Sequence, residues 1–123
     1  MVQELRWIML SKHEVVTALE AHNRMTPNFM PPGTITAWED IDQTSIKVTM
    51  TTVSGLKTLF LGTDKLLQPL IRFCIENNIM LPLDGHKSVM VGNSNISLCI
   101  ALEINAVFID KSFPARLHQF AFV

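Results

Sequence analysis

The sequence predicts an α+β fold in which an antiparallel sheet carries two helices on one face. The first observation is an order of local signals (strand, capped helix, Pro/Gly loop, two strands) that occurs twice along the chain. The second is an alternation of apolar and polar residues, with a period of two, over residues 46–50 and again over residues 96–102. The third is an apolar stripe with helical spacing after the first strand of each half. Placing both helices on the same face of the sheet would bury both stripes.

The two halves of the chain show a weak internal similarity. Residues 5–11 (LRWIMLS) and residues 56–62 (LKTLFLG) share an apolar pattern at a shift of 51 residues. Leu19 and Leu70 are related by the same shift. We therefore expect a tandem β-α-β-β pseudo-repeat, with halves at about residues 4–53 and 55–103.

The last part of the chain, residues 104–123, has no counterpart in the first half. Residues 106–109 are apolar and predict one further strand, so this C-terminal tail is expected to be held on the core or on another subunit. A chain of 123 residues is long enough for one hydrophobic core and too short for two independent ones. Residues 1–123 are therefore expected to form a single domain.

In the first half, the apolar run of residues 5–10 predicts a buried strand, with Trp7 in the core. Ser11 and Glu14 have the spacing of a capping box, in which each side chain accepts a hydrogen bond from the backbone N–H of the other residue. The helix is expected to end near residues 23–24, because three prolines follow closely. The two strands that follow are predicted at residues 34–41 and 44–53.

The second half has the same order. Residues 56–61 predict a strand with Phe60 in the core. Thr63 is the expected N-cap of the second helix, and Asp64 lies at the positive end of the helix dipole. Pro69 either kinks this helix or marks its first turn. The two strands that follow are predicted at residues 87–91 and 96–102.

The composition is rich in apolar residues. Hydrophobic residues make up 48% and charged residues 17% of the chain, against about 25% charged residues in typical globular domains. Either the core is large for the length, or an apolar surface is buried against a partner. We favour the second explanation, because a small domain needs the most polar cover. A net charge of −1 without a basic block argues against nucleic-acid binding.

The cellular compartment of the protein can be predicted from its apolar runs, the pattern at the start of its sequence and its cysteines. No run approaches the roughly 18 apolar residues that cross a membrane. The start of the sequence lacks the basic and then apolar pattern of a secretory signal. Cys74 and Cys99 lie in apolar helix and strand patterns, so we expect free, buried thiols. These features predict a cytoplasmic protein that does not contact a membrane.

Patterns typical of catalysis and of metal binding are missing. His13 and His22 lie more than two helical turns apart, too far to ligate one ion together. We find no activated nucleophile motif, no phosphate-binding loop and no dinucleotide signature. We therefore expect no metal and no cofactor, and a function that is not enzymatic.

One polar stretch, residues 84–88, has the composition of an anion site. It combines the imidazole of His86 with the fixed positive charge of Lys87. Arg72 on the preceding helix is expected to approach this stretch, so the candidate ligand-binding residues are Arg72, His86 and Lys87. The simpler explanation of the same stretch, which we favour, is a turn that leads into a strand. It supports an alternative hypothesis, in which a small-molecule-binding protein or small enzyme takes an anionic ligand between the two halves.

Apolar loops and the apolar tail support the leading hypothesis, a non-enzymatic interaction module that forms a homodimer. Phe29 and Met30 lie in a Pro-containing loop and look exposed, and the tail adds further bulky side chains. An exposed final strand would also be able to pair across a two-fold axis. The candidate interface residues are Phe29, Met30, Phe108, Phe113, Phe120 and Phe122.

Overall fold

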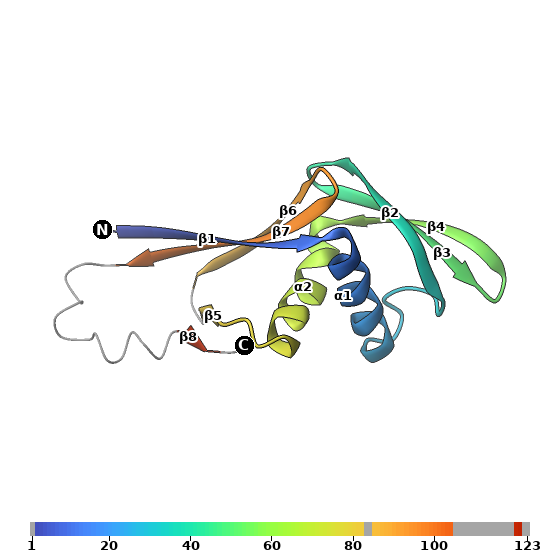
Figure 1. The fold of residues 1–123 in the computed structure, drawn as a ribbon, viewed down its shortest axis with the longest axis horizontal. Helices are drawn as coiled ribbons and strands as arrows, with labels where there is room; N and C mark the ends of the chain where they lie inside the picture. Colours follow the sequence, from blue (N-terminus) through green and yellow to red (C-terminus); the bar gives the residue numbers. More distant parts are fainter. Residues whose placement is uncertain (1, 83–84, 105–119, 122–123) are drawn as a thin grey trace.

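The computed structural model describes residues 2–82, 85–104 and 120–121, which form two helices and two three-stranded antiparallel sheets (Figure 1). The first half contains β1 (Val2–Ser11), α1 (Lys12–Met25), β2 (Thr34–Asp42) and β3 (Ser45–Thr52). The second half contains β4 (Gly55–Gly62), α2 (Thr63–Glu76), β6 (His86–Gly92) and β7 (Asn95–Ile104). Two short strands, β5 (Leu81–Pro82) and β8 (Phe120–Ala121), pair with each other. The α+β class is confirmed, while a duplication behind the recurring element order stays a prediction.

The first strand of each half pairs with the hairpin of the other half. One sheet has the order β1-β7-β6 and the other has the order β2-β3-β4. The strands divide between two sheets, where the sequence predicted one, because each helix carries the chain from one sheet to the other. The sheets meet at their hairpin turns. There the Val91 N–H of β6 donates to the Gln43 carbonyl at 3.1 Å. The Thr63 N–H, at the start of α2, donates to the Thr44 carbonyl at 2.9 Å and continues the pairing of β4 with β3.

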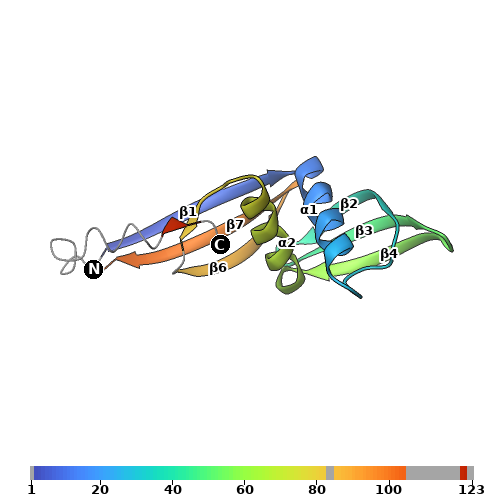
Figure 2. The ribbon, with the colours of Figure 1, turned by 90° about the horizontal axis from the view of Figure 1, so that it is seen from below.

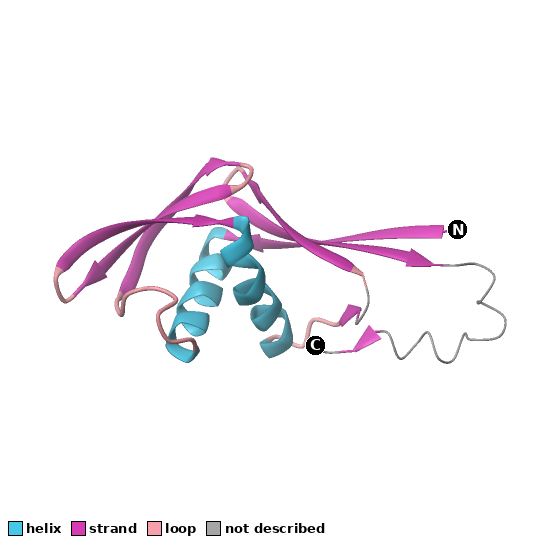
Figure 3. Cartoon of the chain, turned by 180° about the vertical axis from the view of Figure 1, so that it is seen from behind, coloured by secondary structure: helices cyan, strands magenta, loops and turns pink. Residues whose placement is uncertain are grey.

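Both helices lie on the same side of the two sheets, as expected (Figures 1 and 3). They pack against each other beneath the junction where the sheets meet. The opposite, outer faces of the sheets are not covered by any described element (Figure 3). Each strand that packs on the helices therefore has one covered face and one open face.

The predicted capping box starts α1. The Ser11 Oγ accepts from the Glu14 N–H at 3.4 Å, and the Glu14 Oε1 accepts from the Ser11 N–H at 2.9 Å. The hydrogen bond from the Ser11 backbone is the main cause that holds the pKa of Glu14 below its ordinary value. The helix runs to Met25, slightly further than the prolines suggested. The residues that α1 buries are Val15, Ala18, Leu19 and His22.

The start of α2 differs from the prediction. The N-cap is Gly62 and not Thr63, and no side chain caps this end, although Asp64 does lie in the first turn. Pro69 lies in the interior of the helix and is buried, so it does not mark the first turn. Its ring nitrogen cannot donate to the carbonyl one turn before it, which removes one bond from the helix. The residues that α2 buries are Leu66, Pro69, Leu70 and Cys74.

The core lies between the helices and the inner faces of the sheets. Trp38 of β2 is buried there, and its Nε1–H donates to the Lys12 carbonyl at 3.0 Å. The expectation that Trp7 and Phe60 lie in the core is wrong, since both are among the exposed large side chains. Side chains along a strand alternate between the two faces of the sheet, and only the inner face is covered by the helices. In β1, Leu10 therefore points into the core, while Trp7 points outward.

Further sequence expectations can be compared with the described residues. The last long strand, β7, is the central strand of its sheet and offers no free edge. Cys74 is buried and Cys99 is half-buried, and both are free thiols. Neither described helix is long and apolar enough to cross a bilayer. Within residues 2–82, 85–104 and 120–121, no group of three or more His, Cys, Asp or Glu side chains is arranged to hold a metal ion.

The division between a covered and an open face predicts unequal costs of truncation. Leu98→Ala removes a fully buried side chain of β7 and is expected to lower the free energy of unfolding by about 2–5 kcal/mol. Leu56→Ala truncates an exposed side chain of β4 and should change it by no more than about 0.5 kcal/mol. Urea denaturation of both variants measures the difference. Equal losses would contradict the assignment of inner and outer faces.

Candidate functional site

Three large apolar side chains of β1 stand on the outer face of the first sheet. Leu5, Trp7 and Met9 are 65%, 51% and 63% exposed. Residues that pair directly across two strands share a face of the sheet. The partners of these three residues on β7 are small: Ala101, Cys99 and Ser97. The bulky side chains therefore stand at the margin of the sheet beside a row of small residues.

Among the described strands, β1 is also an edge strand with one side unpaired. Its described pairing is with β7 alone, in a register without shifts from Val2 to Ser11. Figure 2 shows no described element alongside the other edge of β1 before the chain enters α1. A long, regular and apolar edge presents unpaired backbone N–H and C=O groups to any chain that can add a strand.

The edge of β2 carries protections that β1 lacks. Its register shifts between Ile35 and Ala37 and again between Asp40 and Asp42. Such irregularities twist an edge and interrupt its row of donors and acceptors. The Ile35 N–H is also taken up by the Glu20 carboxylate of α1, at 3.0 Å. β2 is therefore poorly suited to pairing with another chain.

β4 is the edge most similar to β1. Its register with β3 is regular, and Leu56 and Phe60 are 74% and 67% exposed. Between them stands Thr58, where β1 has Trp7 at the corresponding place in its pattern. β4 has 8 residues and β1 has 10. β6, the other edge of the first sheet, is also regular, but it has only 7 residues and its Val91 N–H donates to the Gln43 carbonyl. β1 is therefore the longest of these three regular edges, and β4 provides a matched comparison.

Two predicted interface residues, Phe29 and Met30, lie in the loop between α1 and β2. Met30 is buried and is therefore not exposed as its loop suggested, and its N–H donates to the Asn23 Oδ1 at 2.9 Å. Phe29 is half-buried, with its ring edge-to-face against His22 at 4.7 Å. Of Phe120, the structure describes only the backbone pairing of β8 with β5. The predicted residues outside the described ranges are Phe108, Phe113 and Phe122. An interface role for these six residues stays a prediction.

The three predicted ligand-binding residues do not form one cluster. His86 and Lys87 are consecutive on β6, so their side chains point to opposite faces of the sheet. Arg72 of α2 reaches instead towards α1, where its Nη1 lies 3.3 Å from the sulfur of Met25. Within the described ranges, no hydrogen bond or ion pair joins Arg72 to either residue of β6. Anion binding by any of the three stays a prediction.

Arg72 belongs to a cluster that sequence reasoning missed, centred on the buried His22. The Arg72 Nε donates to the His22 Nδ1 at 3.3 Å. Because Nδ1 accepts, the neutral ring carries its proton on Nε2, which lies 3.3 Å from the Thr26 hydroxyl and donates to it. Burial, and then the positive charge of Arg72, lower the pKa of His22. The cluster joins the two helices and the loop after α1 as long as His22 is neutral.

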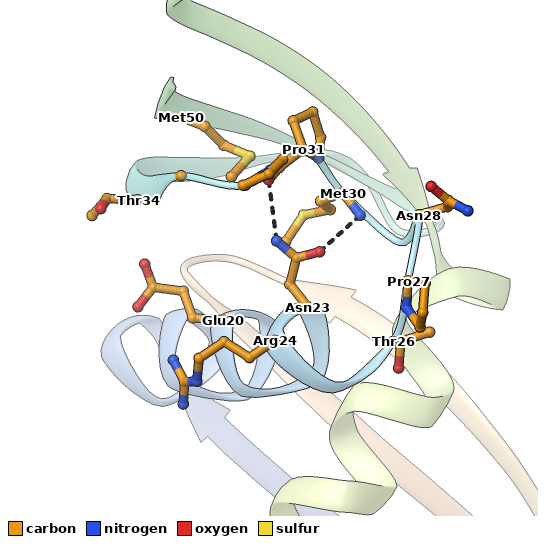
Figure 4. A pocket seen from close by; sticks show the side chains of 12 residues that line it. Glu20, Asn23, Arg24, Thr26, Pro27, Asn28, Met30, Pro31, Thr34 and Met50 are labelled. Atoms are coloured by element: carbon orange, nitrogen blue, oxygen red, sulfur yellow. Dashed lines mark hydrogen bonds between the residues drawn. The ribbon is translucent and has the colours of Figure 1, made fainter. Parts of the chain in front are cut away.

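A groove of about 950 Å³ lies between the last turns of α1 and the loop that leads into β2 (Figure 4). The Asn23 side chain holds that loop, because its Nδ2 donates to the Pro31 carbonyl at 3.1 Å while its Oδ1 accepts from the Met30 N–H. Glu20 and Arg24, one helical turn apart, line the helix side with opposite charges. The groove lies within the first half, and not between the halves where the sequence placed a ligand.

The His22 cluster predicts a loss of stability in mild acid. A lowered pKa means that the unfolded chain binds the His22 proton more tightly than the folded protein does. The stabilisation is therefore fully present above the ordinary histidine pKa of 6.5 and is lost as the pH falls through the lower, folded pKa. Chemical denaturation between about pH 7.5 and 5 should show a declining free energy of unfolding.

His22→Gln should flatten this decline, and His86→Gln, on the exposed start of β6, should leave it unchanged. Glu14 and Asp42 also have lowered pKa values, but their carboxyl groups titrate at lower pH in all three proteins. The same slope in wild type and His22→Gln would show that His22 does not couple folding to pH.

No protein-family model, no curated protein and no solved structure matches this chain. A functional assignment therefore rests on the geometry of the chain itself. In the described part of the chain, two features have the character of a site, namely the apolar edge of β1 and the groove beside α1.

Proposed function

We propose that this chain is a non-enzymatic interaction module that forms a homodimer through the free edge of β1. The observation that supports this most is the coincidence of two features on one strand. β1 has a regular register with an edge that no other described strand pairs, and it carries the exposed side chains of Leu5, Trp7 and Met9. Strand addition to such an edge is a common mode of recognition, in which the backbone supplies affinity and alternate side chains supply specificity.

A second copy of the chain is the partner that this edge fits best. Two identical strands that pair antiparallel across a two-fold axis present the same apolar pattern to each other, so the surface is self-complementary. Pairing satisfies the free backbone groups of both strands and brings the outer apolar side chains into cross-strand contact. The apolar composition, with 48% hydrophobic and 17% charged residues, also favours a surface that is buried on association.

The groove beside α1 supports a second candidate function, the binding of a small molecule. Its volume of about 950 Å³ is within the usual range for ligand pockets, and Arg24 offers a positive charge at its helix side. This candidate predicts that native mass spectrometry finds a discrete non-covalent mass on the chain, which Arg24→Glu removes. A bare mass in both proteins would count against it.

Charged substitutions on β1 test the homodimer. Leu5→Lys/Met9→Lys replaces two exposed apolar side chains with lysines, which natural edge strands use to prevent pairing. The double variant should raise the dimer dissociation constant at least about tenfold, equivalent to about 1.4 kcal/mol. Light scattering over a range of protein concentrations measures this constant, and thermal unfolding shows whether the variant stays folded.

The matched control is Leu56→Lys/Phe60→Lys, which makes the same change on the regular edge of β4. It should dimerise as the wild type does. A monomeric wild type would contradict the proposal. Loss of the dimer in the β4 variant, with the β1 variant unaffected, would transfer the interface to β4.

A further inference from the structure

We infer that the two-fold axis of the dimer passes between Trp7 and its symmetry mate, so that Leu5 of each copy lies opposite Met9 of the other. This inference rests on the proposed self-association through β1. It concerns the register of the interface, which decides which side chains meet. The register follows from three constraints: the symmetry, the length of the strand and the position of its charges.

Symmetry restricts the axis to a residue position. When two copies of β1 pair antiparallel around an axis perpendicular to the sheet, the outer face of one copy continues the outer face of the other. Because side chains alternate between faces, a residue can then lie opposite only residues of its own face. One residue of β1 must therefore lie directly opposite its own symmetry mate, with the axis between the two. Each choice of this residue, called here an axis at that residue, defines one register.

The length of β1 favours two of these registers, because they pair the longest stretch of the strand. β1 spans Val2–Ser11, so an axis at Arg6 pairs residues 2–10 and an axis at Trp7 pairs residues 3–11. An axis at Leu5 or at Ile8 shortens the paired stretch at one end and leaves more backbone groups free. Since unpaired edge groups are the liability that the dimer removes, the two longest registers are favoured.

Charge separates the remaining two registers. An axis at Arg6 places this side chain directly opposite its symmetry mate, and like charges directly opposed on neighbouring strands are destabilising. Arg6 is also held in place, because its Nη1 donates to the Met80 carbonyl at 3.1 Å. An axis at Trp7 places Arg6 opposite Ile8 and the indole ring opposite its symmetry mate, and it pairs the exposed Leu5 with the exposed Met9. This register opposes no like charges.

The resulting dimer has one continuous six-stranded sheet in the order β6-β7-β1-β1-β7-β6. Because the axis is perpendicular to this sheet, the helices of both copies lie on the same side of it. The outer side carries the six apolar side chains of the two β1 strands at its centre, in three cross-strand pairs. Two aromatic rings paired in this way stabilise a sheet beyond the area that they bury.

Disulfide trapping tests the register. Directly paired residues of antiparallel strands have Cα atoms about 4.5–5.5 Å apart, which suits a disulfide. Cys99 lies beside Trp7 on the same face, so the variants are made in a Cys99→Ser background, while the fully buried Cys74 is kept. Leu5→Cys/Met9→Cys is compared with each single variant after oxidation with copper phenanthroline. Within one extended strand these two positions are too far apart to bridge.

The Trp7 register predicts a covalent dimer from the double variant and none from either single variant. A covalent dimer from Leu5→Cys alone would move the axis to Leu5 and overturn the register, while keeping the β1 interface. No covalent dimer from any variant, although light scattering still finds a dimer, would overturn the register, and the dissociation constant of Leu5→Lys/Met9→Lys would then decide whether the β1 edge stays the interface. A monomer by light scattering before oxidation would contradict the proposed self-association itself.

Discussion

The antiparallel ladder between β1 and β7 is the constraint on which the rest of the structure depends. It joins the start of the described chain to its last long strand, through a register that runs from Val2↔Ile104 to Ser11↔Asn95. Without it, the first sheet has no third strand, and α1 is no longer held beneath the junction of the two sheets. The ladder also places β1 at the margin of its sheet, where no other described element covers its outer face or pairs with its second edge. Because its residues are so distant in the sequence, it is expected to form late and slowly in folding.

The exchange of first strands explains why one core serves both halves. β1 joins the hairpin of the second half, and β4 joins the hairpin of the first. Neither half could bury its apolar residues alone, since each sheet takes strands from both. The helices, each of which links one sheet to the other, bury their apolar stripes in the shared core. The His22–Arg72 contact adds a polar link between the two helices.

Local sequence patterns predicted the positions of most helices and strands, whereas the division of the strands between two sheets depends on long-range pairing. The spacing of Ser11 and Glu14 identified the start of α1, and the alternation of residues 46–50 identified β3, because these signals depend on neighbours in the sequence. The division into two sheets depends on which distant strands pair, and local periodicity carries no information about that. Trp7 was misplaced for this reason, since the run of residues 5–10, apolar except for Arg6, is typical of a strand covered on both faces.

The candidate sites show the same contrast. His86 and Lys87 are adjacent on a strand, so their side chains face opposite sides of the sheet. The sequence alone therefore argues against a cluster that contains both residues and Arg72. The contact between Arg72 and His22 depends on how α1 and α2 pack, which the sequence pattern does not encode. The strict alternation of large and small residues along β7, with Ser97 and Cys99 on the outer face, was the available signal that this face of the sheet lacks a covering layer.

Hydrogen–deuterium exchange at two protein concentrations measures most directly whether β1 pairs with a second copy of the chain. Amides on the free edge of β1 are protected only if a second copy pairs with them, whereas the edge of β4 has no such partner in this account. If β1 pairs with a second copy, we expect slow exchange along β1 at high concentration, faster exchange after dilution, and no change in β4. Equal exchange along β1 at both concentrations, with light scattering showing a dimer at the higher one, would contradict this pairing.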